Sequence, residues 1–395
     1  MLGLLLAAVL TGPGPEEGLV LDVGVALTME DRRVLHNARI LVRDGRIEAV
    51  GRQAELEAPE GWQRLAFPRS WAFPGGVDLH SHVHTGGWND INDMVHPVNA
   101  ELRTLDTIVP WNDAFQRAVA GGVTTVNSIP GSGTNLSGAG TLVKLKPVRS
   151  VAEAVLRFPG SVKVAQGYNP ERIGDLGGTR MGMWWMLRWY LHRAERVAAG
   201  EDPGSRIELE YLAGIFEGRH PFLVHTAGGR DTFGTVRMFA LEAGVPVVVS
   251  HASFDGWKTG PALARTGASL NVGPRGFDAR WPGDGSIRGL VAAYEAAGSR
   301  DLSVQTDSPV VDQEDFFYQA TMAERLGASC WTALESLNAA PARQILAGDR
   351  IGRLAPGLDA DIVVKAGQPL DPRTPVQLVL VDGEVAYDRC AGARY

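Results

Sequence analysis

Alternating apolar and polar residues occupy both ends of the chain. Three runs near the start have the two-residue period of β-strands, residues 20–28, 38–42 and 46–50. Three runs near the end repeat this pattern, residues 362–365, 376–381 and 384–387. Asp44-Gly45 and Asp382-Gly383 each separate two such runs, and an Asp-Gly pair in that position predicts a β-hairpin. We therefore predict one small, discontinuous β-sandwich domain, built from residues 19–72 and 350–395.

The middle of the chain, residues 73–349, has a different pattern. Short β-branched runs recur at residues 123–129, 161–165, 222–225, 245–251, 268–272 and 302–306. Helical patterns lie between some of them, at residues 111–120, 181–199 and 232–243. Alternating strands and helices predict a parallel sheet, and a long series favours a closed barrel. The first strand is not followed by a glycine-rich dinucleotide-binding motif. The predicted fold class is thus α/β, with a (β/α)₈ TIM barrel.

Composition narrows the classes of protein that fit. The chain has 395 residues, which suits one large domain with a smaller one. The net charge is −7 and the basic residues do not cluster, which argues against nucleic acid as a partner. The two cysteines, Cys330 and Cys390, are far apart, so neither a disulfide framework nor a zinc–cysteine site is expected. The expected partner is a small-molecule substrate, and a homo-oligomer stays open.

The first ten residues are apolar, and Thr11-Gly-Pro-Gly-Pro15 follows them. This segment resembles the core of a signal peptide, although it lacks a positively charged start. It is too short to cross a bilayer, so no membrane span is expected. We set residues 1–18 apart as a possible signal peptide or disordered segment, and leave open whether the protein is cytoplasmic or exported.

The segment from Pro74 to His84 carries the first sign of chemistry. It reads as an apolar strand that ends in His80 and His82. Residues at i and i+2 of a strand point to the same face, so both imidazoles would face one point, as two metal ligands do. Other strands end in His225, His251 and Asp307, and Lys163 lies inside an apolar strand. Barrel enzymes place their catalytic groups at such strand ends.

These motifs resemble the amidohydrolase superfamily, in particular its imidazolonepropionase-related and prolidase-like members. The resemblance rests on residues 73–82, on the ordered strand ends His225, His251 and Asp307, and on residues 353–362. It implies that His80 and His82 bind a metal ion. Asp307 would be a further ligand and the proton shuttle for a metal-activated hydroxide. His225 and His251 would bind a second ion or hold the substrate's carbonyl oxygen.

The resemblance also implies a metal cofactor, and it leaves the number of metal ions open. One or two divalent ions are expected, zinc by default, and iron, manganese or cobalt would also fit. Lys163 is a candidate for the carboxylated lysine that bridges two metals in binuclear members. An alternative is that its stem packs along the strand while the ammonium reaches solvent.

Several readings of the activity remain open. The favoured one is hydrolysis of a carbon–nitrogen bond other than a peptide bond, in a linear or cyclic amide. The first alternative is a prolidase-like metallodipeptidase, and the second is a non-catalytic relative of the barrel. A deaminase is less favoured, because Gly228 stands where those enzymes carry a glutamate. Arg230 and Tyr168 are the candidate substrate-binding residues.

Overall fold

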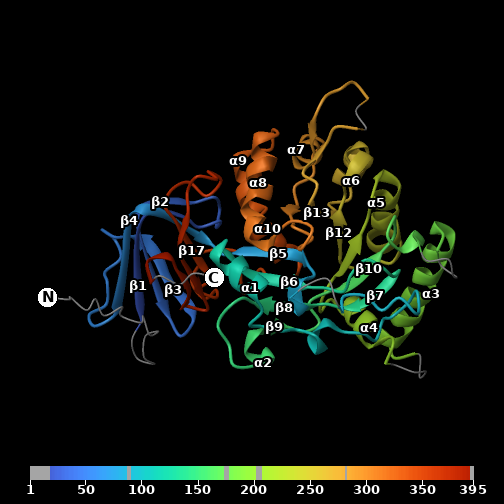
Figure 1. The fold of residues 1–395 in the computed structure, drawn as a ribbon, viewed down its shortest axis with the longest axis horizontal. Helices are drawn as coiled ribbons and strands as arrows, with labels where there is room; N and C mark the ends of the chain where they lie inside the picture. Colours follow the sequence, from blue (N-terminus) through green and yellow to red (C-terminus); the bar gives the residue numbers. More distant parts are fainter. Residues whose placement is uncertain (1–17, 87–89, 173–177, 202–206, 281–282, 392–395) are drawn as a thin grey trace.

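A computed structural model describes residues 18–86, 90–172, 178–201, 207–280 and 283–391. Two parts lie side by side, a β sheet built from both ends of the chain and a larger α/β part (Figure 1). The apolar segment that resembles a signal peptide lies outside the described residues, except for Gly18. None of the described helices is long and apolar enough to span a membrane.

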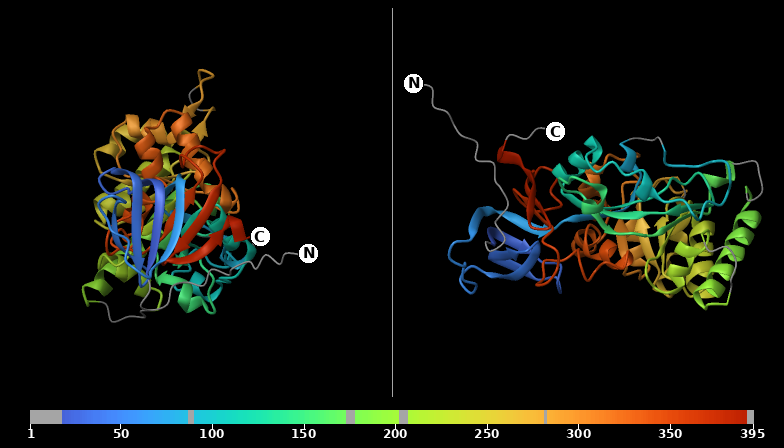
Figure 2. Two further views of the ribbon diagram at one scale, coloured as in Figure 1. Left: turned by 90° about the vertical axis from the view of Figure 1, so that its left-hand side faces the viewer. Right: turned by 90° about the horizontal axis from the view of Figure 1, so that it is seen from below.

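The terminal sheet joins strands that are far apart in the sequence. Its seven strands lie side by side in the order β19 (Glu384–Asp388), β18 (Val376–Val381), β17 (Ile362–Lys365), β4 (Gln63–Pro74), β1 (Leu19–Leu27), β2 (Val34–Arg43) and β3 (Arg46–Arg52). Figure 2 shows the N-terminal and C-terminal strands in one surface. Strands from both termini share this sheet, as predicted, and the described strands hydrogen-bond into one continuous sheet, while the β-sandwich domain stays a prediction.

Local turn chemistry explains the two hairpins of this sheet. Asp44 and Gly45 have φ angles of 51° and 75°, and they connect β2 to β3. Asp382 and Gly383 have φ angles of 49° and 76°, and they connect β18 to β19. Positive φ at both central residues is what a two-residue hairpin turn requires. Both predicted hairpins are therefore present.

The α/β part contains seven parallel strands in two sheets. The strands are β5 (Gly76–Ser81), β6 (Val123–Ser128), β10 (Val162–Ala165), β11 (Phe222–His225), β12 (Val247–His251), β13 (Ser269–Val272) and β16 (Leu302–Val304). A parallel bridge between Ser81 and Ser308 joins one pair of sheet edges. Hydrogen bonds of Gly140 with Ser161 and Gly160 join the other pair, so the two sheets connect at both edges.

The alternation of strands and helices is interrupted between β6 and β10. Here the chain forms three short strands, β7 (Leu136–Ala139), β8 (Thr141–Lys144) and β9 (Val155–Arg157). β7 pairs antiparallel with β10 in one sheet, and β8 pairs antiparallel with β6 and β9 in the other. The preceding residues 131–140 include four glycines and only one large apolar side chain, so they cannot form an amphipathic helix. This departure from a strict (β/α)₈ series had no clear signal in the periodicity.

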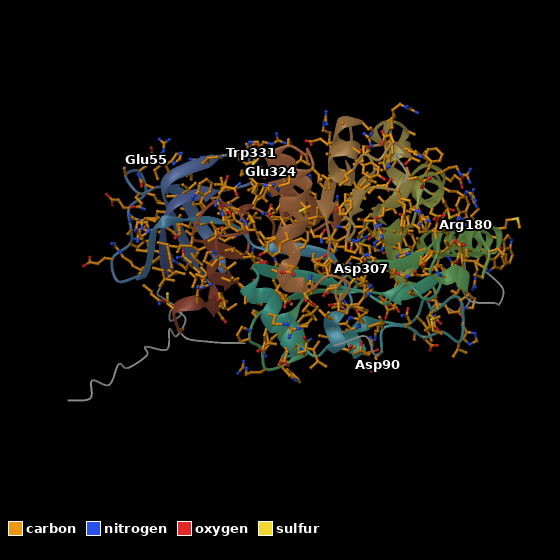
Figure 3. All side chains as sticks on the ribbon, turned by 45° about the horizontal axis from the view of Figure 1, so that its top comes forward. Glu55, Asp90, Arg180, Asp307, Glu324 and Trp331 are labelled. Atoms are coloured by element: carbon orange, nitrogen blue, oxygen red, sulfur yellow. The ribbon has the colours of Figure 1, made fainter. Side chains whose placement is uncertain are left out.

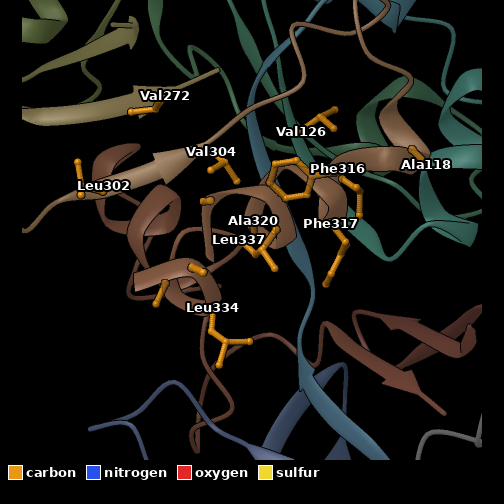
Figure 4. Close-up of a cluster of buried hydrophobic side chains, with 14 of the residues drawn as sticks. Ala118, Val126, Val272, Leu302, Val304, Phe316, Phe317, Ala320, Leu334 and Leu337 are labelled. Carbon is orange, nitrogen blue, oxygen red and sulfur yellow. The ribbon is translucent and has the colours of Figure 1, made fainter. Parts of the chain in front are cut away.

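Helices surround the parallel strands. They are α1 (Asp113–Ala120), α2 (Val151–Ala154), α3 (Arg180–Ala198), α4 (Glu210–Phe216), α5 (Gly229–Thr235), α6 (Gly260–Ala264), α7 (Leu290–Ala296), α8 (Phe316–Arg325), α9 (Cys330–Glu335) and α10 (Ala339–Gln344). The helix predicted at 232–243 is α5 continued by a π-helical turn, Val236–Glu242. Figure 4 shows the apolar core between helices and strands, in which Phe316 and Phe317 pack near Val126 and Val304.

A buried ion cluster joins the two parts. Lys144, at the end of β8, places its Nζ 2.6 Å from Asp361, 3.0 Å from Asp382 and 3.1 Å from Asp359. Lys144, Asp359 and Asp361 are each only 3% exposed. Because these carboxylates all lie in the C-terminal segment of the sheet part, Lys144 connects it electrostatically to the α/β part.

Candidate metal centre

Six side chains that the strand-end pattern singled out come from neighbouring strands. His80 lies in β5 and His82 directly after it, Lys163 lies in β10, and His225 and His251 end β11 and β12. Asp307 follows β16 by three residues, and Figure 3 places it in the interior of the α/β part. Carboxyl ends of parallel strands meet on one face of such a fold, and the site lies there.

The first two histidines converge on Asp307. Asp307 Oδ1 lies 3.3 Å from His80 Nε2 and 3.2 Å from His82 Nε2. One ligand atom from each of the three residues lies within 4.8 Å of the others, which makes this a possible metal site. The expectation that the two imidazoles face a common point therefore agrees with the geometry.

The other two histidines lie against this group. The ring centroid of His251 is 4.6 Å from that of His80 and 4.4 Å from that of His225. His251 Nε2 and His225 Nδ1 are buried and have no hydrogen-bond partner among the described residues. Buried polar atoms are nearly always paired, so unpaired imidazole nitrogens beside a cluster of metal-ligating residues fit a metal ion or substrate at this position.

Contacts on the far side of the rings fix which nitrogen carries the proton. His82 Nδ1 lies 3.0 Å from the carbonyl oxygen of Ile129, and His251 Nδ1 lies 2.7 Å from that of Gly273. A carbonyl oxygen only accepts hydrogen bonds, so Nδ1 is the protonated nitrogen in both rings. Each Nε2 then presents a lone pair, as a metal ligand must.

Burial keeps His80 and His251 neutral. It lowers the pKa of His251 to about 4, although Asp307 opposes the change. Burial, together with the nearby Lys163 and His251, also holds the pKa of His80 well below its usual value. Burial alone would raise the pKa of Asp307, but the close contact of its Oδ1 with His82 and the nearby His251 and Lys163 lower it. Neutral imidazoles beside an ionised carboxylate form a donor set that suits a divalent cation.

Lys163 lies inside this group. Its side chain is fully buried, and its Nζ lies 2.9 Å from His80 Nε2. Burial lowers the pKa of Lys163 to about 7, with Asp307 opposing the change. The alternative in which the ammonium reaches solvent is therefore wrong. Lys144, a weaker rival for the bridging role, belongs to the ion cluster at the junction with the terminal sheet.

Backbone geometry at two strand ends is unusual. His251 has a φ of 70° and Asp307 a φ of 51°, in the left-handed region that residues other than glycine seldom adopt. Such conformations persist where the surrounding structure imposes them, and they occur often at active sites.

Asp78 acts on the backbone and not on an imidazole. Its carboxylate accepts hydrogen bonds from the backbone N–H groups of His80 and Thr306, and from the side chains of Thr306 and Gln313. Asp78 therefore connects β5 to the segment that carries Asp307. Burial raises the pKa of Asp78 to about 6, and these hydrogen bonds oppose the increase.

The structure leaves the two predicted substrate-binding residues outside the histidine group. Tyr168 is 66% exposed and follows β10. Arg230 is exposed and lines a cavity of about 460 Å³ together with Trp184, Arg237 and Lys258. His84, which the sequence favours as a loop residue, is instead fully buried in a 3₁₀ turn, Val83–Thr85.

Two residues of this region had no signal of their own in the sequence. Ser250 contacts His80, and Gln305 contacts His251. Their only sequence clue is position, since Ser250 precedes a strand-end histidine and Gln305 lies two residues before Asp307.

Comparison with known proteins shows similarity to amidohydrolases. No protein-family model matches the chain. The amidohydrolase tasK of Hapsidospora irregularis is 26% identical over 356 residues, which cover 80% of this chain and 36% of tasK. The chain thus spans about a third of the length of that relative. An amidohydrolase structure from Thermotoga maritima MSB8 has a TM-score of 0.83 and 27% identity, covering 94% of this chain and all of that one.

A prolidase structure with bound N-methylphosphonate-L-proline has a TM-score of 0.60 and 16% identity, with 94% of this chain and all of that one covered. At this identity the likeness shows the fold alone. The chain is similar to amidohydrolases in sequence and in structure, which confirms the resemblance that the strand-end motifs indicated. Its fold matches amidohydrolase structures with a mixed α/β architecture.

Proposed function

We propose that the protein is a metal-dependent hydrolase that cleaves a carbon–nitrogen bond, other than a peptide bond, in a small linear or cyclic amide. The observation that carries the proposal is the convergence of His80, His82 and Asp307, whose ligand atoms lie within 4.8 Å of one another. Similarity to amidohydrolases supports the reaction class.

The residues fit a divalent metal ion. His80, His82 and Asp307 would hold a first ion, and His225 and His251 would hold a second one if the site takes two. Because His251 Nδ1 faces a carbonyl oxygen, its Nε2 has no proton to donate to a substrate, which favours the role of metal ligand. Nitrogen and oxygen donors suit zinc first, and iron, manganese or cobalt would also bind. A bound ion would polarise the substrate's carbonyl group and lower the pKa of water.

Asp307 is the proposed proton shuttle. Its lowered pKa keeps the carboxylate ionised at neutral pH, so that it accepts a proton from the attacking water. The same carboxyl group then delivers this proton to the leaving nitrogen. Its side chain is 19% exposed, less buried than His80, so it can face both the metal ligands and a substrate.

A metallodipeptidase is the second candidate, and the position of Lys163 favours it. A lysine whose pKa is about 7 is partly neutral at neutral pH, and a neutral amine can add to CO₂. That step would form a bond between Nζ and the carbon of CO₂ and release one proton. The resulting carboxylate would bridge two metal ions between the pairs His80/His82 and His225/His251.

Metal content separates these candidates. We would measure metal per chain by elemental mass spectrometry in the wild type, in Lys163→Ala and in Lys365→Ala. Lys365 is a matched control because it is also buried, yet its Nζ contacts the carbonyl oxygen of Pro369. Two ions that fall to one or none only in Lys163→Ala would support the dipeptidase. One ion in all three proteins would support the single-metal amide hydrolase, and no metal in any of them would refute both.

A further inference from the structure

A buried hydroxyl group lies behind the first histidine of the site. Ser250 immediately precedes His251 in β12, is fully buried, and places its Oγ 2.5 Å from His80 Nδ1. Gln305 Nε2 lies 3.3 Å from the same Oγ and 3.0 Å from His251 Nδ1. One hydroxyl and one amide therefore connect the outer sides of two histidines that come from different strands.

The remaining contacts of Ser250 give the direction of its hydrogen bonds. Its hydroxyl donates to Asn271 Oδ1 at 3.4 Å. The amide of Asn271 in turn donates to Ser303 Oγ at 2.8 Å and to the carbonyl oxygen of Val304 at 3.2 Å, which fixes its orientation. Lys163 Nζ, which carries N–H donors, lies 2.9 Å from His80 Nε2, and this contact assigns the ring proton to Nδ1 and makes Ser250 Oγ its acceptor. The lone pair of His80 then lies on Nε2, which faces Lys163 and Asp307.

We propose that Ser250 is a positioning residue of the metal site. It accepts the Nδ1 proton of His80, fixes the tautomer and the ring orientation, and so presents Nε2 to a divalent cation. This inference rests on the proposed function, because the cation is the ligand that His80 would bind. Metal-ligating histidines generally donate their other N–H to a fixed acceptor, and loss of that acceptor weakens metal binding. His82 and His251 use carbonyl oxygens for this purpose, whereas His80 uses a side chain that can be removed.

The same polar network supplies a matched control. Ser303 is as buried as Ser250, accepts from Asn271 and donates to Gln344 Oε1 at 2.6 Å. Among the described residues, the hydrogen bonds of the Ser303 side chain reach no histidine. Ser303→Ala therefore removes an equally buried hydroxyl from the network without changing the acceptor behind His80.

The test compares the wild type, Ser250→Ala and Ser303→Ala after removal of metal with a chelator. The dissociation constant for Zn²⁺ is measured by competition with a fluorescent chelator. We expect Ser250→Ala to raise this constant about 10–100-fold, and Ser303→Ala to leave it near the wild-type value. Equal effects of the two substitutions would overturn the inference, because the serine would then act only through general packing.

A second measurement reads the histidine directly. In metal-free protein labelled with ¹⁵N-histidine, NMR distinguishes the Nδ1–H from the Nε2–H tautomer of His80. We expect the Nδ1–H form in the wild type and in Ser303→Ala, and a mixture in Ser250→Ala. An unchanged tautomer in Ser250→Ala would overturn the inference. Absence of zinc binding from all three proteins would refute the proposed function, and the tautomer would still decide the role of Ser250.

Discussion

The ion cluster between the two parts of the molecule should be a main determinant of stability. We predict that Lys144→Met lowers the free energy of unfolding, because it removes the cation that contacts three aspartates. Asp359 keeps Arg350, at 2.9 Å, and Asp382 keeps Lys146, at 2.8 Å. Asp361 loses the only ion pair that it makes among the described residues and keeps a hydrogen bond from the backbone N–H of Asp382.

The size of the decrease in the free energy of unfolding depends on how many of the three aspartates lose their only cation. Leaving one buried charge without its partner costs about 3–5 kcal/mol. Because only Asp361 is left unpaired, we expect a loss near the lower limit, about 3 kcal/mol. Lys146→Met is the control, since Lys146 is more exposed and supports only Asp382, and it should cost about 1 kcal/mol or less.

The pH dependence of the loss gives a second check. Burial already raises the pKa of Asp361, and Lys144 opposes this increase, so Lys144→Met should raise the pKa further. Between the unfolded-state pKa and this higher value, the folded variant binds more protons than the unfolded chain, so its stability falls as the pH rises. The difference between variant and wild type should therefore be larger at pH 7 than at pH 5.

Urea unfolding followed by circular dichroism measures these differences at both pH values. A loss at pH 7 below about 1 kcal/mol, the usual range for an exposed ion pair, would refute the reasoning. The double variant Lys144→Met/Asp361→Asn should recover part of the loss, because it removes the unpaired charge as well. If it is no more stable than Lys144→Met, the loss does not come from Asp361.

Three further predictions concern a histidine, the proton shuttle and a glycine. Burial lowers the pKa of His220 to about 4, so the unfolded chain binds an extra proton below pH 6.5. The free energy of unfolding should fall by about 3 kcal/mol as the pH drops from 6.5 to about 4. Urea unfolding should show that this decrease is absent from His220→Gln. Asp307→Asn should lower kcat for any amide substrate about 10²–10⁴-fold while circular dichroism stays unchanged, and a smaller effect would assign the proton transfer to another group. In Gly121→Ala the new Cβ would lie 2.4 Å from the carbonyl oxygen of Glu314, so thermal unfolding should show a loss of about 1–3 kcal/mol. Gly276→Ala, whose Cβ would meet only a side-chain oxygen at 4.0 Å, is its control.

Features set by local chemistry could be predicted from the sequence. The Asp-Gly turns fixed two hairpins, and β11 has the predicted limits, residues 222–225. The strand-end histidines and Asp307 converge because parallel strands share one carboxyl face. These predictions needed only short-range patterns and one rule about where parallel strands end.

Other features depend on contacts that the sequence does not reveal. Ser250 and His80 are 170 positions apart and meet only because β5 and β12 face the same interior. β7 and β8 stand where a strand–helix step is expected, and each takes its partner from a different sheet, β10 for β7 and β6 for β8. The sequence favours a loop position for His84, yet the 3₁₀ turn Val83–Thr85 buries it completely.

The order of strands in the terminal sheet has a consequence for synthesis of the chain. β4 pairs with β17, and Phe73 faces Val363 across this pair. While a ribosome produces the intervening residues, that side of β4 has no partner, and an unpaired strand edge is prone to associate with other chains. We therefore expect β4 to gain its partner only after residue 365 has left the ribosome, and the sheet to be complete only after β19, Glu384–Asp388. Folding of the nascent protein should thus depend on protection of the β4 edge until its last segment arrives.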